Sequence, residues 1–210
     1  MIAVVDYGAS NVQSVLRALR AVGETAELTA DPDRVRAAER VVVPGVGHFA
    51  PARRRLDETG LADAIGDVAR AGRPLLGICL GLQLFLEESE EAPGVPGLGL
   101  LPGAVTRFRT SLPVPHVGWA RVALTPAGKS HPTLARAFHG DAGFFYHVHS
   151  YHPARVAPES DLAEAEYGGG GSAPFATVVG KANVLGVQFH PEKSQAAGLA
   201  LLREFTTWAP

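Results

Sequence analysis

Apolar residues in the first 90 positions recur with two spacings, one typical of buried strands and the other typical of amphipathic helices. Four short β-branched runs predict strands, at residues 2–6, 25–28, 40–44 and 74–78. Three stretches with helical spacing predict helices, at residues 12–22, 61–69 and 80–88. Ser10 or Asn11 could cap the first of these helices. The alternation indicates parallel strands joined by crossover helices.

The pattern changes after Ser89, where a segment rich in proline and glycine interrupts the chain. Shorter strand-like runs follow, at residues 104–109, 119–124, 144–149, 161–167, 176–179 and 184–189. The last two runs predict a β-hairpin, and the glycine run at 168–171 predicts a surface turn. Leu199, Leu202 and Phe205 predict one face of a closing helix that Ser194 could cap.

These elements predict an α/β fold with a largely parallel central sheet, flanking helices and additional antiparallel strands. The chain has 210 residues, of which 46% are hydrophobic and 19% are charged, so we expect one domain over residues 1–210. A formal net charge of -2 provides no positive field for a nucleic acid or an anionic membrane, and we expect neither as a partner. The absence of a long apolar run and of a basic leader predicts a cytoplasmic location.

Cys79 is the single cysteine of the chain, which excludes an internal disulfide. It lies at the centre of Gly-Ile-Cys-Leu-Gly, residues 77–81, where a predicted strand meets a predicted helix. The flanking glycines are typical of a nucleophile elbow, a turn so sharp that a neighbouring Cβ would collide. The helix that begins at Leu80 offers free N–H groups for an oxyanion. A buried structural cysteine is the commoner fate of a free thiol, but the glycines favour a nucleophile.

A cysteine nucleophile needs a base, and the base needs an orienting group. His190 and Glu192 follow a predicted strand and are separated by a proline that fixes the backbone between them. Taken alone, this His-Pro-Glu segment would be interpreted as a solvated turn. Together with the elbow it predicts a Cys-His-Glu triad of Cys79, His190 and Glu192.

Gly45, Val46 and Gly47 form a third strand-end loop, where glycines let the backbone approach a ligand closely. Ligands of open parallel sheets lie beyond the carboxyl ends of the strands, so this loop should meet the elbow in one crevice. We expect Val46 and Gly47 to supply the second donor of an oxyanion hole, beside the N–H of Leu80. A dinucleotide site is excluded because the full glycine pattern is missing.

His147 and His149 point the same way on a predicted strand and could share a metal ion. Because no acidic ligand is adjacent, we expect no catalytic metal ion here. We expect the segment at residues 146–152 to lie on the rim of the crevice instead. The sequence leaves two positions open for His116 and Trp119: they could be core residues, whereas an exposed aromatic side chain there would indicate an interface.

Several motifs resemble, in their order, those of the triad (class I) glutamine amidotransferases, and within them the glutaminase subunit of imidazole glycerol phosphate synthase. The matching segments are residues 6–11, 44–49, 77–83, 87–94, 115–119, 149–151 and 188–194. The elbow and the His-Pro-Glu turn carry the resemblance to the superfamily. Three segments resemble more specifically the glutaminase subunit of histidine biosynthesis: Pro-Gly-Val-Gly, Pro-His-Val-Gly-Trp and Glu-Lys-Ser.

The resemblance implies a single-domain class I glutamine amidotransferase fold that hydrolyses L-glutamine to glutamate without a cofactor. Ammonia would pass through a channel to a (β/α)₈-barrel cyclase subunit in a heterodimer, giving imidazole glycerol phosphate and aminoimidazole carboxamide ribotide. Cys79 would be the nucleophile, His190 the base and acid, and Glu192 its orienting group. The implied glutamine-binding residues are Gly45, Gln83, Glu91, His149, Ser150 and Tyr151. The implied partner-facing residues are Asn11, Trp119 and Tyr146.

Two other functions remain open from the sequence. Another triad amidotransferase or a Cys-His-Glu hydrolase would use the same elbow and would be fully active without a partner. A catalytically silent subunit would only bind a partner, but the complete triad argues against it. The chain ends at residue 210 without a linker, which favours a cyclase on a separate chain.

Overall fold

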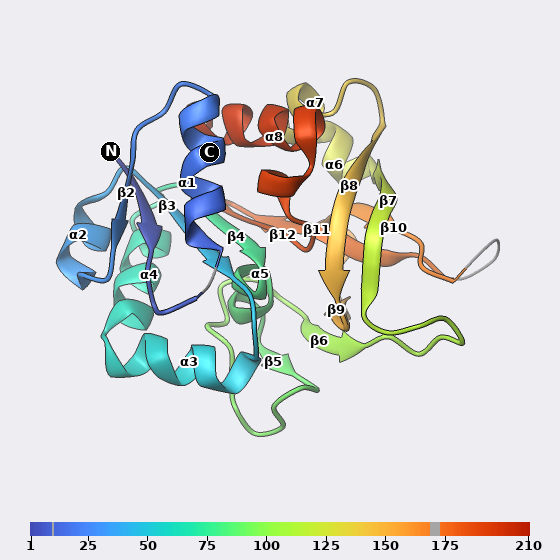
Figure 1. Cartoon of the computed structure of the whole chain (residues 1–210), viewed down its shortest axis with the longest axis horizontal. Coiled ribbons are helices and arrows are strands. Elements are labelled where there is room, and N and C mark those ends of the chain that lie inside the picture. The colour runs from blue at the N-terminus through green and yellow to red at the C-terminus, as the bar shows by residue number, and fades with distance from the viewer. Residues whose placement is uncertain (10, 169–172) are drawn as a thin grey trace.

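A nine-stranded sheet forms the centre of the computed structural model, which describes residues 1–9, 11–168 and 173–210 (Figure 1). Its strands in spatial order are β2 (Ala26–Thr29), β1 (Ile2–Val5), β3 (Arg40–Gly45), β4 (Leu75–Cys79), β12 (Val184–Val187), β11 (Phe175–Lys181), β10 (Asp161–Ala165), β7 (His116–Leu124) and β8 (Ala142–His149). The first five strands, from β2 to β12, run parallel to one another. The pairs from β12 to β8 are antiparallel. The expected mixture of parallel and antiparallel strands is confirmed.

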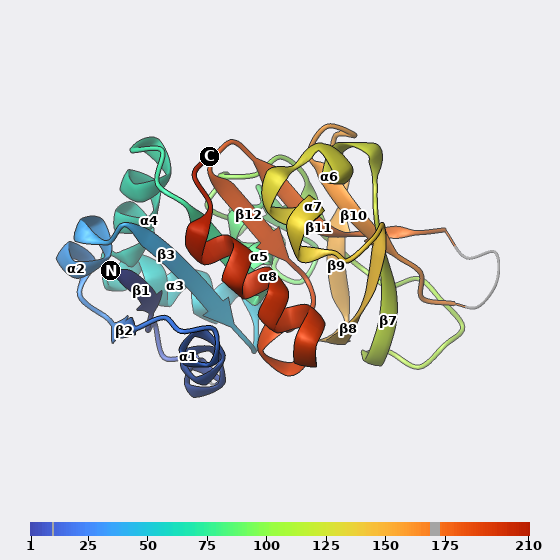
Figure 2. The ribbon, with the colours of Figure 1, turned by 90° about the horizontal axis from the view of Figure 1, so that it is seen from above.

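Helices cover both faces of this sheet (Figure 2). One face carries α1 (Val12–Ala21), α6 (Pro126–Ser130), α7 (Pro132–Ala137) and α8 (Gln195–Thr207), and the other carries α2 (Pro32–Ala37), α3 (Phe49–Glu58), α4 (Leu61–Arg70) and α5 (Leu80–Phe85). Because strand side chains alternate, Ile2 and Val4 of β1 join the first core while Ala3 and Val5 join the second. Burial on both faces explains why these strands appear as continuous apolar runs.

The carboxyl ends of the parallel strands bring the candidate residues to one edge of the sheet. The register of β3 and β4 pairs Gly45 with Cys79, and that of β12 and β4 pairs Val187 with Ile78. The segment after Val187 therefore emerges beside the elbow, and η1 (Pro191–Lys193) follows it. The expected crevice at this edge is consistent with the topology.

A second sheet of three strands lies next to this edge. It consists of β5 (Glu88–Ser89), β6 (Ala104–Arg107) and β9 (Tyr151–Ala154). The pairing of Arg107 with Tyr151 brings the middle of the chain against the segment that follows β8. This sheet was not predicted, since two of its strands were assigned to other elements or to loops.

Several local expectations need correction. The helix expected over residues 80–88 ends at Phe85, because the carbonyl groups of Leu84, Phe85 and Leu86 accept hydrogen bonds from the loop at residues 98–101. Ser194 precedes α8 as expected, but its hydroxyl group donates to the carbonyl oxygen of His190 (2.6 Å). The expected cap at Ser10 and the glycines at 169–171 lie outside the described residues.

The predicted hairpin of β11 and β12 is confirmed by its antiparallel register. Helices α2 and α3 were not predicted; Asp31 caps α2 by accepting from the N–H of Asp33 (2.9 Å), ahead of a proline in the first turn. Among the described residues, no helix is long and apolar enough to cross a membrane.

Candidate active site

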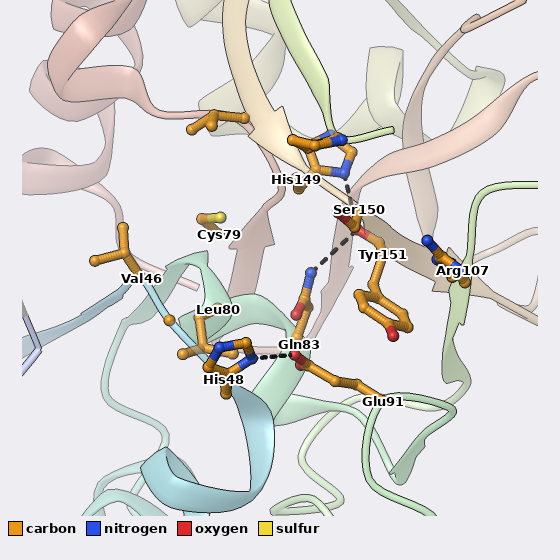
Figure 3. A pocket seen from close by; sticks show the side chains of 13 residues that line it. Val46, His48, Cys79, Leu80, Gln83, Glu91, Arg107, His149, Ser150 and Tyr151 are labelled. Carbon is orange, nitrogen blue, oxygen red and sulfur yellow. Dashed lines mark hydrogen bonds and ion pairs between the residues drawn. The ribbon is translucent and has the colours of Figure 1, made fainter. Parts of the chain in front are cut away.

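Cys79 occupies the strained turn that the flanking glycines predict. Its φ and ψ are 53° and -105°, between the end of β4 and the start of α5. A Cβ on Gly81 would overlap the carbonyl oxygen of Val43, and one on Gly77 would lie 2.8 Å from the backbone of Gly81. The turn is therefore tight enough to exclude a side chain at either flanking glycine, and it presents the thiol to a cavity (Figure 3).

His190 and Glu192 form the remainder of the expected triad. The Nδ1 atom of His190 lies 2.7 Å from Oε1 of Glu192, and both side chains are almost fully buried. Burial alone would lower the pKa of His190, but the charge and hydrogen bonding of Cys79 and of Glu192 raise it to about 10. The Nε2 atom has no aligned hydrogen-bond partner among the described residues, so the imidazole is close to the thiol but not in ideal contact with it.

Gln188 is a buried contact of the thiol that the sequence analysis did not identify. Its Nε2 atom donates to Sγ of Cys79 (3.6 Å), while its Oε1 atom accepts from Nε2 of Gln83 (3.1 Å). The second amide proton of Gln83 binds the carbonyl oxygen of Tyr151 (3.1 Å). These contacts fix both amides, so that Gln188 directs an N–H group at the sulfur and Gln83 keeps its Oε1 atom for another donor.

Asn11 contacts the triad instead of capping α1. Its Nδ2 atom donates to Oε1 of Glu192 at 2.6 Å, and its backbone lies in the left-handed region with φ of 82°. The same carboxylate oxygen therefore accepts from both Asn11 and His190. Asn11 holds Glu192 in place for His190, and its expected role at a partner interface stays a prediction.

The loop after β3 runs past the elbow as expected. Tyr7 donates a hydrogen bond to the carbonyl oxygen of Pro44 (2.8 Å), and its ring is buried. A Cβ on Gly45 would collide with the Tyr7 hydroxyl group and with Leu80, so this contact requires glycine. Gly47 has φ of 111°, in the region that glycine adopts most readily. Tyr7 thus anchors one end of the loop, while Gly47 supplies a flexible joint at the other.

The candidate substrate pocket is a cavity of about 590 Å³ in front of Cys79 (Figure 3). Expected site residues that line it are Val46, Gly47, Cys79, Leu80, Gln83, Glu91, His149, Ser150 and Tyr151. Gly45, His190 and Glu192 are not among its lining residues; Gly45 pairs with Cys79 across β3 and β4, and the side chains of His190 and Glu192 are buried. The structure therefore brings together the residues of the triad, the loop and the glutamine-binding set.

Charged groups of opposite sign border the pocket. Glu91 accepts from the backbone N–H of Phe49 (3.0 Å) and contacts Nδ1 of His48 (2.8 Å). Arg107 lies on the opposite side of the pocket from Cys79, with Gln83 and Tyr151 between them (Figure 3). A carboxylate and a guanidinium near the end remote from the thiol suit the ammonium and carboxylate of an amino acid.

Trp119 and Tyr146 occupy the outer face of β7 and β8. They pair across the two strands, their rings pack edge to face at 6.2 Å, and Trp119 is 47% exposed. Of the two positions left open for Trp119, the structure therefore excludes the core, and the exposed aromatic side chain fits the interface alternative. His116 faces the other way and is buried, as expected of a core residue.

His116, His147 and His149 form a buried cluster beneath the pocket. Burial lowers the pKa of His149 to about 3 and keeps that of His147 well below the usual range. Burial also lowers the pKa of His116, so the neutral imidazole, which offers a lone pair for a hydrogen bond or a metal ion, is favoured in all three residues.

Four site residues were missed from the sequence, namely Tyr7, His48, Arg107 and Gln188. A signal existed for Gln188, because a glutamine between Val187 and Phe189 interrupts an apolar strand and must find buried partners. Nothing in the local pattern marks Arg107, which reaches the pocket only because β6 pairs with β9.

Comparisons with known proteins agree with this geometry. The family model for glutamine amidotransferase class-I matches residues 3–207. Imidazole glycerol phosphate synthase subunit HisH of Moorella thermoacetica is 45% identical, over 97% of this chain and 93% of the relative. The same subunit of Symbiobacterium thermophilum is 44% identical, over 96% of this chain and 91% of the relative.

The fold also matches solved structures of low sequence similarity. A crystal structure of a glutamine amidotransferase superposes with a TM-score of 0.75 at 19% identity, covering 99% of this chain and 98% of that one. At this identity the likeness shows the fold alone, whereas the family model and the sequence relatives span nearly the whole chain. The chain belongs to the class-I glutamine amidotransferases, and within them to the family of imidazole glycerol phosphate synthase subunit HisH.

Proposed function

We propose that this chain hydrolyses L-glutamine to glutamate and ammonia, with Cys79 as nucleophile. The observation that carries the proposal is the position of the thiol on a strained turn at the wall of the cavity, beside the buried pair of His190 and Glu192. The raised pKa of His190 favours a protonated imidazole, which can give its proton to the leaving amide nitrogen.

The reaction proceeds through a thioester. The thiolate attacks the side-chain amide carbon of glutamine, and the resulting oxyanion is held by the N–H of Leu80 and by an N–H of the loop at Val46 and Gly47. His190 gives its proton to the amide nitrogen, the C–N bond breaks and ammonia leaves. His190 then removes a proton from water, which adds to the thioester; the C–S bond breaks and glutamate is released.

Substrate selectivity comes from the end of the pocket remote from the thiol. Glu91 and Oε1 of Gln83 accept from the α-ammonium group, and Arg107 pairs with the α-carboxylate. The segment at Ser150 and Tyr151 borders the same space and completes the enclosure. An amino acid with an amide at the tip of its side chain places that amide at Cys79.

We further propose that ammonia passes to a (β/α)₈-barrel cyclase on a separate chain, which makes imidazole glycerol phosphate and aminoimidazole carboxamide ribotide in histidine biosynthesis in the cytoplasm. The curated relatives are named as subunits of imidazole glycerol phosphate synthase, and the outer face of β7 and β8 fits a docking surface. Val117 (57%) and Phe144 (60%) are exposed on this face beside Trp119 and Tyr146. We place Asn11 at the edge of the same heterodimer interface.

Partner binding also provides a switch for the oxyanion hole. Glutamine hydrolysis without a waiting acceptor would waste ammonia, so the second oxyanion donor should be withheld until the cyclase holds its own substrate. The Val46–Gly47 peptide can rotate, because Gly47 already has φ of 111° and no heavy atom lies within 4 Å of its would-be Cβ. Loss of one donor costs on the order of 10²–10³ in turnover, which suffices for control.

The test is glutamate release by the chain alone, with the cyclase, and with the cyclase plus its nucleotide ligand. The proposal predicts low basal release that rises by orders of magnitude only in the third case. Full activity of the isolated chain would instead support the independent Cys-His-Glu hydrolase. Binding of glutamine and cyclase without any turnover would support the silent subunit.

A further inference from the structure

The buried histidine cluster beneath the glutamine pocket is not used by the proposed reaction. His116 of β7 pairs in register with His149 of β8, and His147 precedes His149 by two positions, so all three side chains lie on the inner face of the two strands. One ring nitrogen from each lies within 4.8 Å of the others. His147 is fully buried, and the other two are at most 6% exposed.

The hydrogen bonds of the cluster define where its lone pairs are. The carbonyl oxygen of Tyr151 lies 2.8 Å from Nδ1 of His149, and because a carbonyl only accepts, this nitrogen carries the proton. The Nε2 atom of the same neutral ring therefore presents a lone pair, and Nδ1 of His147 lies 2.9 Å from it. A single proton between these two nitrogens holds the cluster together.

A metal ion can take the place of that proton with little movement of the rings, while the proton moves to Nε2 of His147, which has no hydrogen-bond partner among the described residues. Bonds of about 2.0–2.1 Å from zinc to two imidazole nitrogens at a tetrahedral angle place the nitrogens roughly 3.3 Å apart. The observed separation of 2.9 Å is close to this value. The Nδ1 N–H group of His149 donates to the carbonyl oxygen of Tyr151. Metal-binding histidines are commonly oriented in this way, with one ring nitrogen on the metal and the other donating to a carbonyl oxygen.

A third ligand is available on the neighbouring strand. The ring of His116 stacks on that of His147 with centroids 5.0 Å apart, and its Nδ1 atom has no hydrogen-bond partner within the part of the chain that the structure describes. Buried nitrogens without partners are rare and call for an explanation such as an ion. Pro115, Val148 and His149 line the glutamine pocket, so an ion could enter from it and keep water in its fourth position.

We propose that His116, His147 and His149 bind one divalent transition-metal ion of the Zn²⁺ class through three neutral imidazoles. Imidazole ligands favour Zn²⁺, Co²⁺, Ni²⁺ and Cu²⁺ over Mg²⁺ and Ca²⁺, which prefer oxygen. The ion takes no part in the proposed glutamine hydrolysis.

The experiment titrates the chelator-treated full chain with Co²⁺, whose tetrahedral complexes absorb visible light, and then displaces Co²⁺ with Zn²⁺. We expect one ion per chain, a tetrahedral spectrum and a rise in thermal midpoint with Zn²⁺. His147→Phe, which keeps an aromatic ring in the core, should weaken binding by about 100-fold or more, and His116→Phe should do the same. His139→Gln, which changes an exposed histidine, is the matched control and should bind normally.

Cys79 with His190 is a competing zinc site, so Cys79→Ser is part of the same experiment. It should retain the ion if the cluster is the site. Binding that disappears in Cys79→Ser and persists in His147→Phe would overturn the proposal. Absence of stoichiometric binding to the wild-type chain would overturn it as well, whether or not the variants fold.

Discussion

Gln188 offers a direct test of how the buried amides support the thiol. Replacing Gln188 with methionine keeps a side chain of similar length and volume but removes the N–H that lies 3.6 Å from Sγ of Cys79. A hydrogen bond to a charged group is worth about 1.5–3 kcal/mol, and each 1.4 kcal/mol corresponds to a factor of ten. Loss of this hydrogen bond to the sulfur should therefore lower kcat by about 10- to 150-fold.

The change in KM for glutamine should be smaller, because Gln188 does not line the pocket and Gln83 keeps its contact with Tyr151. The assay is steady-state glutamate release in the presence of the liganded cyclase, with the rate of alkylation of Cys79 as a second readout. Gln13→Met changes an exposed glutamine and serves as control. A Gln188→Met enzyme with kcat within twofold of wild type would refute the reasoning, provided that its thermal midpoint is also unchanged.

Three further outcomes are expected. Arg107→Ala should raise KM for glutamine by about 10-fold with little change in kcat. Arg109→Ala, which changes an exposed neighbour, should change neither constant. Equal effects of the two variants would contradict the proposed contact of Arg107 with the substrate carboxylate. Gly47→Val should lower the cyclase-stimulated rate by about 10²–10³ while glutamine binding, measured by calorimetry, stays nearly constant. Because the pKa of His190 is raised in the folded state, its protonation should increase the free energy of unfolding. This contribution should be fully present below about pH 6.5 and should be lost as the pH rises towards 10. His190→Gln should flatten this part of the pH profile of the free energy of unfolding.

The elements that could be predicted from the sequence are those governed by local patterns. The strands β1, β3 and β4 are apolar on both faces, and Gly77 is required by contacts with residues 81–85, just after the turn. Gly81 faces Val43, and this close approach follows from the parallel pairing that the strand pattern already indicates. The parallel strands and the sharp turn at Cys79 could therefore be predicted from local spacing.

The features that were missed depend on pairing between distant segments. Asn11 was interpreted as a cap or an interface residue, but its amide reaches Glu192, 181 positions away. Trp119 was left between core and interface, because its spacing along the chain does not say which face of β7 the rest of the protein covers. Spacing along the chain carries no information on such partners.

Cys79 is the proposed nucleophile of a partner-dependent glutaminase. The most direct measurement is the rate of glutamate release by Cys79→Ala in the presence of the cyclase and its nucleotide ligand, compared with wild type under the same conditions. We expect the rate of glutamate release to fall by at least about 10⁴-fold, because the thiol is a reactant. Folding and partner binding should be retained, because the thiol contributes little core volume. Residual turnover close to that of wild type would contradict the assignment of Cys79 as nucleophile.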